Sequence, residues 1–175
     1  MRVLMVAVCL LVLAVENVWA SDYSIELTQE QLQKAVAARM PAKMEKMFSS
    51  LTLSNPQVVL NENSDRIGLE VDLDFNLAGT VSGKGKGLID GNIIYVREEG
   101  EFHFVNPVVK TLQVDGVAPQ FQESIRQLAD ATAKQELAKK PVYTLDGKDL
   151  KQKLAKAVLR SALVKNGKLV LFLQF

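Results

Sequence analysis

Three acidic residues at alternate positions are the first candidates for chemistry in this sequence. Glu70, Asp72 and Asp74 lie within "RIGLEVDLDFNLAG", residues 66–79. Two neighbouring carboxylates can serve as general acid and base, and several that converge can bind a cation. On an extended strand, however, alternate side chains are about 7 Å apart, which is too far for them to hold one ion together. We therefore interpret them as the solvated face of a strand, where their charge discourages edge-to-edge pairing.

The other polar motifs do not form a recognisable catalytic site either. His103 is the only histidine and no G-x-S-x-G sequence is present, so neither a serine triad nor a zinc site is predicted, and His103 is expected on the surface. The segment "GTVSGKGKG", residues 79–87, resembles a phosphate-binding loop but has the wrong glycine spacing and leads into a strand. These observations predict a protein that is not an enzyme and that needs no metal or cofactor.

The charge balance argues against a nucleic-acid partner. The chain has 21 basic and 20 acidic residues, which gives a net charge of +1. A nucleic-acid-binding surface is normally built from a basic excess with interleaved aromatic residues, and neither feature is present.

Residues 1–20 have the layout of a secretory signal peptide. Arg2 precedes an apolar run, and Ala20 is a small residue at the expected cleavage position. The run, residues 3–15, is shorter than the roughly 20 residues that span a bilayer; a retained anchor helix is the alternative. Cys9 is the only cysteine and has too short a segment before it to be a lipidation site. We therefore expect export, cleavage near Ala20, no lipid anchor, and a single domain over residues 21–175 that contains no thiol.

The spacing of apolar residues predicts both strands and helices in the exported part. Residues 50–63 are expected to be extended with a break at Asn55 and Pro56, and three long strands are expected over residues 66–79, 83–96 and 101–115, joined as an antiparallel meander. On the last of these, Val108 is expected on the same face as Phe102 and Phe104. A final strand is expected over residues 168–175, covered on both faces.

Helices are predicted in four places. Thr28 and Gln31 form a capping box that begins a helix, and Pro41 is expected to kink or restart that helix, with Met44, Met47 and Phe48 forming a second apolar patch. The most extended helix is predicted for residues 119–139 and another for residues 146–162. Met40, Met44 and Met47 are expected either in the core or lining an adaptable pocket.

Element lengths predict the architecture. The strand over residues 67–77 extends about 35 Å, and a helix over residues 119–139 extends about 31 Å. Glycines 85, 87 and 91 share one face of their strand and allow a sharp bend or a close approach. The predicted fold is therefore α+β, with a long amphipathic helix wrapped by a highly curved antiparallel sheet.

Three blocks of the sequence occur in a characteristic order: "YSIELTQEQLQKAVA" (residues 23–37), the glycine-containing strand pair, and "KKPVYTLDG" (residues 139–147). Their order and spacing resemble those of the YceB-like family of Gram-negative envelope proteins. This resemblance implies a periplasmic location and a fold similar to the tubular lipid-binding (TULIP) superfamily. In that superfamily a groove between helix and sheet holds a lipid. The absence of a lipid-bearing cysteine departs from the lipoprotein character of most members.

The expected function is therefore the binding of a lipid or another apolar small molecule, held between the helix and the sheet. Tyr95 is the residue expected to offer a polar group to such a ligand. The alternative is a structural or interaction module with a fully packed core, whose surface binds an envelope protein. The residues predicted to line the groove are Leu69, Val71, Leu73, Phe75, Ile89, Ile93, Tyr95, Phe102, Phe104, Phe121, Ile125 and Leu128.

Overall fold

A computed structural model describes residues 23–175 except 146 and 156, and it leaves out the side chains of residues 151 and 152. The predicted signal peptide, its cleavage site near Ala20, and Cys9 lie outside the described residues. Within the described residues, the helices are all too short or too polar to cross a membrane.

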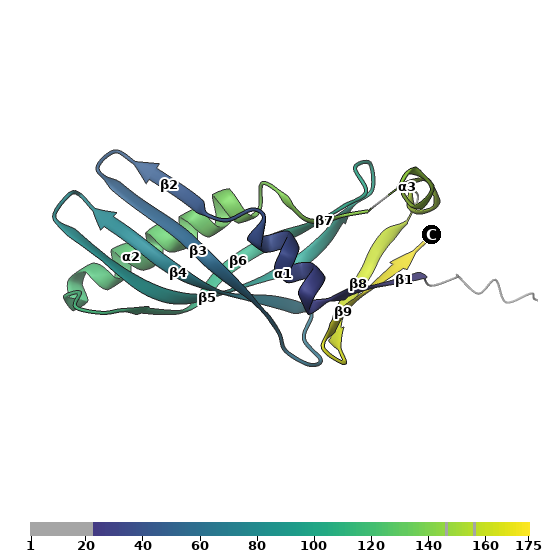
Figure 1. Cartoon of the computed structure of the whole chain (residues 1–175), viewed down its shortest axis with the longest axis horizontal. Helices are drawn as coiled ribbons and strands as arrows, with labels where there is room; N and C mark the ends of the chain where they lie inside the picture. Colours follow the sequence, from purple (N-terminus) through teal and green to yellow (C-terminus); the bar gives the residue numbers. More distant parts are fainter. Residues whose placement is uncertain (1–22, 146, 156) are drawn as a thin grey trace, which may run out of the picture.

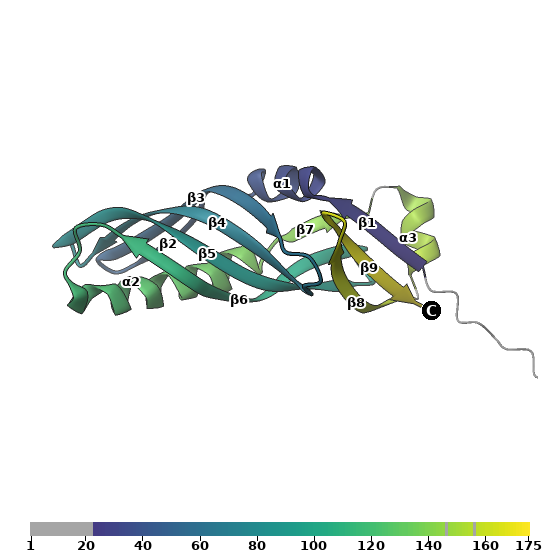
Figure 2. The same ribbon diagram turned by 90° about the horizontal axis from the view of Figure 1, so that it is seen from below.

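Two antiparallel sheets make up most of the described chain (Figures 1 and 2). The larger sheet has six strands in sequential order and curls into a half-barrel. Its strands are β2 (Ala42–Lys46), β3 (Ser49–Leu60), β4 (Arg66–Leu77), β5 (Val81–Val96), β6 (Glu101–Val114) and β7 (Pro141–Thr144). The smaller sheet has the order β1-β9-β8, formed by β1 (Tyr23–Thr28), β9 (Lys168–Gln174) and β8 (Val158–Lys165).

The helices lie between and beside these strands. They are α1 (Gln29–Ala37), α2 (Pro119–Thr132) with its π-helical continuation η1 (Ala133–Leu137), and α3 (Lys148–Leu154). The capping box predicted at Thr28 is confirmed: Gln31 N–H donates to Thr28 Oγ1 at 3.1 Å, and Thr28 N–H donates to Gln31 Oε1 at 2.9 Å. The mixed fold, the meander of β4 to β6 and the curled sheet are likewise confirmed, and β3 extends the meander by one strand.

The main helix is shorter than the long strand β6 that it packs against. The α2 and η1 segments together have 19 residues and extend about 28 Å, whereas the 14 residues of β6 extend about 46 Å. This helix contacts β6 on one side and β2 and β3 on the other, so it closes one half of the concave face. Helix α1, which contacts β3 and β7, closes the other half.

The segment after Pro41 is a strand, so the predicted helix restart is wrong. Ala42 and Met44 are buried while Lys43 and Glu45 are exposed, an alternation with period two that pairs β2 with β3. Pairing with the edge of β3 satisfies the backbone groups on one side of this short segment and buries Ala42 and Met44, which together outweigh its helical spacing. Met47 does not join an apolar patch with Met44, because it lies in the turn that follows and is 96% exposed.

The helix predicted for residues 146–162 is also wrong in its second half. Residue 146 lies outside the described residues, α3 ends at Leu154, and β8 begins at Val158. Residues 158–165 instead form a hairpin with β9 around Asn166 and Gly167. Their one-turn helical spacing is overridden because the hairpin supplies β9 with its second neighbour and buries Val164 and Leu169. The last strand is present as predicted over residues 168–174.

Two Asn-Pro pairs interrupt β3 and β6 in the same way. Asn55 and Asn106 have positive φ angles of 48° and 51°, and each lies at a shift in strand register. Such a bulge inserts an extra residue and moves the following side chains to the opposite face. This shift makes the prediction for Val108 wrong: it is 45% exposed, and its neighbour Val109 is buried.

The two helices satisfy the sheet edges that these bulges leave unpaired. On β3, Val58 N–H donates to Gln33 Oε1 at 2.8 Å, and its carbonyl accepts from Gln29 Nε2 at 2.8 Å. On β6, Val109 N–H donates to Asp130 Oδ1 at 3.0 Å, and its carbonyl accepts from Arg126 Nη1 at 2.8 Å. Neither valine has a strand partner on that side, so each helix covers one edge of the half-barrel.

Glycines on the concave face of β5 make room for aromatic rings. A Cβ atom at Gly91 would lie 2.3 Å from the Phe104 ring, and one at Gly83 would lie 3.0 Å from the Phe75 ring. The close approach expected of the helix is therefore made at Gly91 by a side chain of the neighbouring strand β6 instead.

Candidate ligand-binding interior

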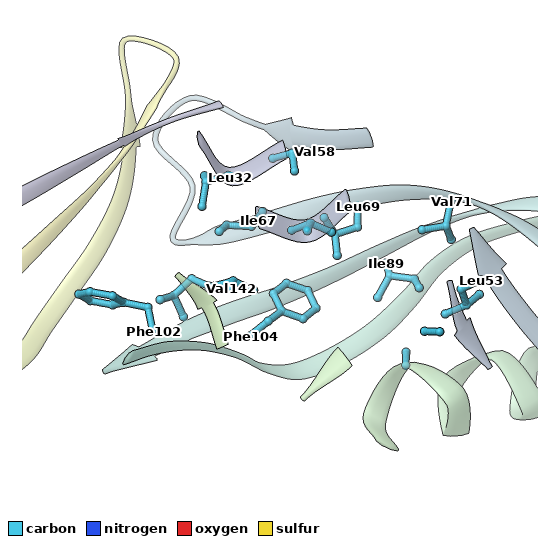
Figure 3. Close-up of a cluster of buried hydrophobic side chains, with 14 of the residues drawn as sticks. Leu32, Leu53, Val58, Ile67, Leu69, Val71, Ile89, Phe102, Phe104 and Val142 are labelled. Carbon is cyan, nitrogen blue, oxygen red and sulfur yellow. The ribbon is translucent and has the colours of Figure 1, made fainter. Parts of the chain in front are cut away.

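The concave face of the half-barrel is apolar along β4, β5 and β6. Because alternate side chains of a strand share a face, the inward positions of β4 come from one parity of the sequence, Leu69 to Phe75. Figure 3 shows side chains of this set, with others from α1 and β7, pointing into a shared interior. Ten of the predicted lining residues are buried members of one core cluster: Leu69, Val71, Leu73, Phe75, Ile89, Ile93, Phe102, Phe104, Ile125 and Leu128.

The other two predicted lining residues lie differently. Tyr95 is only partly buried, its ring packs 4.8 Å from that of Phe102, and its hydroxyl donates to the Leu154 carbonyl at 3.3 Å. Burial, reinforced by the charge of Glu98, raises the pKa of this hydroxyl. The polar group expected to serve a ligand is therefore bonded to α3. Phe121 is partly buried near the start of α2 and does not belong to the core cluster.

Several interior residues were missed by sequence reasoning. From β3 and α1 they are Leu51, Leu53, Val58, Leu32 and Val36, which are all buried in the same cluster. In β3, the buried residues have odd numbers before Pro56 and even numbers after it, and this change of face left a trace in the sequence pattern. A bulge at an Asn-Pro pair explains that change, and the same logic would have identified Val109.

A small cavity lies where α1, η1 and the sheet meet. Its volume is about 20 Å³, and its apolar lining includes Val36, Leu69, Phe104, Leu137 and Val142. This volume is about that of a single water molecule, so side chains fill this part of the interior.

Ionisable side chains surround the outer side of this cavity. Arg39, Glu136 and Lys140 line it together with the apolar residues. Arg39 donates through Nη1 to the Ala35 carbonyl, while Glu136 is paired with Lys139 at 2.6 Å. Partial burial lowers the pKa of Arg39, and the negative charge of Glu101 opposes that shift. The cavity is therefore apolar inside, with two cationic side chains and the carboxylate of Glu136 beside it.

The buried face of α2 is narrow. It consists of Ile125, Leu128, Ala129 and Thr132, and the remaining residues of the helix are exposed or partly exposed. Thr132 Oγ1 donates back to the Leu128 carbonyl at 2.8 Å, just before the helix widens into the π-helical turn. Such turns occur frequently at functional sites. This helix is thus held by four buried side chains and by the hydrogen bonds that Arg126 and Asp130 make with Val109.

One cluster of potential metal ligands lies away from the interior. Ligand atoms of Glu99, Glu101 and His103 lie within 4.8 Å of one another, which among the described residues is the closest approach to a metal-binding set. His103 Nε2 lies 3.0 Å from Glu101 Oε2, so His103 is paired and only partly exposed rather than free on the surface. A hydrogen bond with Glu101 and its like charge raise the pKa of Glu99.

The acidic face of β4 is exposed or partly exposed, as the sequence predicts. Glu70 and Asp74 are exposed, and Asp72 is partly buried because its Oδ2 accepts from Asn55 Nδ2 at 2.8 Å. Asp72 and Asp74 also lie opposite Lys86 and Lys84 on β5 in the strand register. Opposite charges on facing strand positions stabilise that pairing.

Comparison with known proteins gives one family. The model of a family described as "Protein of unknown function (DUF1439)" matches residues 26–168. No curated protein matches the sequence. The matched range includes both helices that close the half-barrel and all the strands that line its interior, since these lie between α1 and β7.

Proposed function

The chain belongs to the DUF1439 family, whose function is not known, and we propose that it is a non-enzymatic periplasmic protein that binds a lipid or another hydrophobic molecule. In this proposal the ligand lies between α2 and the curled sheet, in an arrangement of the TULIP kind. The observation that carries the proposal is the continuous apolar concave face of β4, β5 and β6 beneath a cover that is only 19 residues long. Pockets for hydrophobic ligands are apolar with a few polar groups at the edge.

Binding requires α2 to move, because the closed interior has a cavity of only about 20 Å³. The narrow buried face of α2 makes such a movement less costly than opening a broad helix interface, since the free energy of burial scales with the apolar area. Helix α1 keeps the other half of the half-barrel closed. The cationic side chains of Arg39 and Lys140, beside the cavity between the helices, suit the anionic end of an amphiphile.

Lipid analysis tests this proposal directly. The protein is isolated from the envelope of an expressing bacterium, its N-terminus is identified by intact mass, and co-purifying lipid is sought by native mass spectrometry and solvent extraction. Uptake of an environment-sensitive fluorescent fatty acid is then measured. We expect a bound lipid and saturable uptake of the probe. Repeated absence of both contradicts the proposal.

A pair of helix variants tests whether α2 is the cover. Arg126→Ala with Asp130→Ala removes the two side chains that bond β6, so we expect probe uptake to become several-fold faster. The matched control is Glu123→Ala with Gln127→Ala, which removes a hydrogen bond on the exposed side of the same helix and leaves the uptake rate unchanged. Equal rates in both variants refute the assignment of α2 as the cover.

The alternative is a structural or interaction module of the cell envelope with a packed core. It is favoured by the small cavity volume and by the thorough burial of the interior side chains. The same experiments separate the two functions. A protein that carries no lipid, takes up no probe and crosslinks to one specific envelope protein supports the module.

A further inference from the structure

The turn between β2 and β3 presents two large apolar side chains to solvent. Met47 is 96% exposed and Phe48 is 77% exposed, the highest values among the large hydrophobic residues of the described chain. Lys46, also exposed, comes immediately before them. Leaving two such side chains in water is unfavourable, because full burial of each one favours an apolar environment over water by a factor of about 10 to 100 in the partition constant.

The other turns at this end of the half-barrel are also rich in apolar residues. The turn between β4 and β5 (residues 77–81) and the loop between β6 and α2 (residues 115–118) lie at the same end of the molecule, opposite β1, β8 and β9 (Figure 1). Across these two segments and residues 46–49, the ionisable residues are Lys46 and Asp115 alone. These three turn segments therefore have little charge to desolvate.

An open hollow adjoins the exposed turn. It has a volume of about 450 Å³ and lies between residues 46–49, the β4–β5 turn and the outer side of α2, where Ser124, Gln127 and Ala131 contribute to its lining. Its floor includes Leu77 and Leu128. The arrangement places an ammonium group beside an apolar hollow, which complements an amphiphile with an anionic head and an apolar tail.

We propose that this end of the half-barrel docks on a lipid bilayer, with Met47 and Phe48 inserted at the interface and Lys46 at the level of the phosphate groups. A bilayer fits better than a protein surface because the apolar side chains project from a narrow turn, whereas a stable protein interface needs about 800 Å² on each partner. Interfacial insertion reaches only about 5–10 Å, and the polar groups of a turn can remain hydrated at that depth. A lysine next to the inserted residues is the pattern of an interfacial anchor.

Docking at this end goes beyond the proposed ligand binding and does not depend on it. If both hold, the hollow provides an apolar path from the bilayer to the edge of α2. A protein that binds vesicles but takes up no fatty-acid probe supports docking and refutes the ligand. A protein that takes up the probe but does not bind vesicles supports the ligand and refutes docking.

Vesicle flotation tests the docking with the protein as recovered from the envelope. Vesicles of phosphatidylcholine, with and without phosphatidylglycerol, are floated with the wild type and with Met47→Ser combined with Phe48→Ser. We expect the double variant to lose about tenfold or more of the binding. The control, Ile94→Ser with Val158→Ser, replaces apolar residues that are 44% and 43% exposed and line a different hollow, and it should float like the wild type.

Two further measurements make the result specific. Lys46→Gln should weaken binding about fivefold on the anionic vesicles and not on the neutral ones. Phe48→Trp should give blue-shifted fluorescence that is quenched by brominated lipids, after subtraction of the wild-type signal, since Trp19 is the only tryptophan in the sequence.

The proposal is overturned if the wild type does not float, or if the Met47/Phe48 variant floats as well as the wild type. It is also overturned if that variant instead abolishes a concentration-dependent dimer in sedimentation, which would assign the turn to a second copy.

Discussion

The substitution Gly91→Ala examines how tightly the interior is filled. A Cβ atom at this position would lie 2.3 Å, 2.5 Å and 2.6 Å from three carbon atoms of the Phe104 ring. The ring cannot turn into solvent, because Phe104 is buried, and β6 makes an irregular register opposite Gly91. The added methyl group must therefore displace the ring or the strand.

Two opposing effects set the expected magnitude. Replacing glycine by alanine restricts the unfolded chain and alone stabilises the protein by about 0.4–1 kcal/mol. Forcing an additional methyl group into a filled core costs about 1–3 kcal/mol. We expect the second effect to prevail, with a net loss of about 1–2 kcal/mol in the free energy of unfolding. Gly87→Ala is the matched control in the same strand, since its Cβ would lie no closer than 3.2 Å to Leu73 Cδ1 and 3.3 Å to the Thr111 carbonyl oxygen, contacts that a smaller shift relieves.

Urea unfolding followed by far-ultraviolet circular dichroism measures these differences. The double-mutant cycle with Phe104→Leu is decisive because leucine lacks the ring atoms that Gly91→Ala would meet. In the Phe104→Leu background, Gly91→Ala should be neutral or stabilising, with a coupling energy of at least about 1 kcal/mol. Strictly additive effects would refute the steric account, and equal losses for Gly91→Ala and Gly87→Ala would do the same.

Two other predictions concern hydrogen bonds and pH. Gln33→Ala should lower the free energy of unfolding by about 1–3 kcal/mol, because it leaves the buried Val58 N–H without its acceptor. Gln122→Ala, on the exposed side of α2, is the control for urea unfolding and should change little; equal losses would contradict the edge-covering role of α1. Because Glu101 raises the pKa of Glu99, the folded protein binds the Glu99 proton more tightly than the unfolded chain does. The resulting stabilisation of the folded state is fully present below the unfolded pKa of about 4.3 and is lost as the pH rises through the higher folded pKa. The stability of Glu99→Gln relative to the wild type should therefore increase as the pH rises from about 4.3, and a difference in urea midpoint that does not change with pH would refute this assignment.

The strands were predictable because their burial alternates with period two. On β4, the parity from Ile67 to Phe75 is buried as the sequence indicated, and the neighbouring turns set the register of β5 and β6. The segments that were predicted wrongly, residues 41–48 and 158–162, are short ones in which pairing with a distant strand decides the outcome. Local spacing carries no information on that pairing, because β2 needs the edge of β3 and β8 needs β9.

The candidate interior was predictable in its composition but not in its packing. The alternation of apolar residues along a strand indicates that Leu69 and Phe104 point inward. It does not indicate whether the inward side chains contact one another or enclose a cavity. That depends on the helices, whose positions are set by contacts remote in sequence, such as those of Gln33 with β3 and Asp130 with β6.

These edge contacts also bear on how the closed molecule would admit the ligand that we propose. Each helix bonds a strand just beyond an Asn-Pro bulge, where the sheet has no further strand to pair with. If α2 moves outward, the Val109 backbone groups lose their partners but gain access to water, so the cost is that of exchanging hydrogen bonds rather than of leaving them unmade. The apolar face of α2 must then find another apolar surface, and a ligand in the interior supplies one. Opening would therefore be favoured only when a hydrophobic molecule is present, as expected for a binding protein that remains closed when empty.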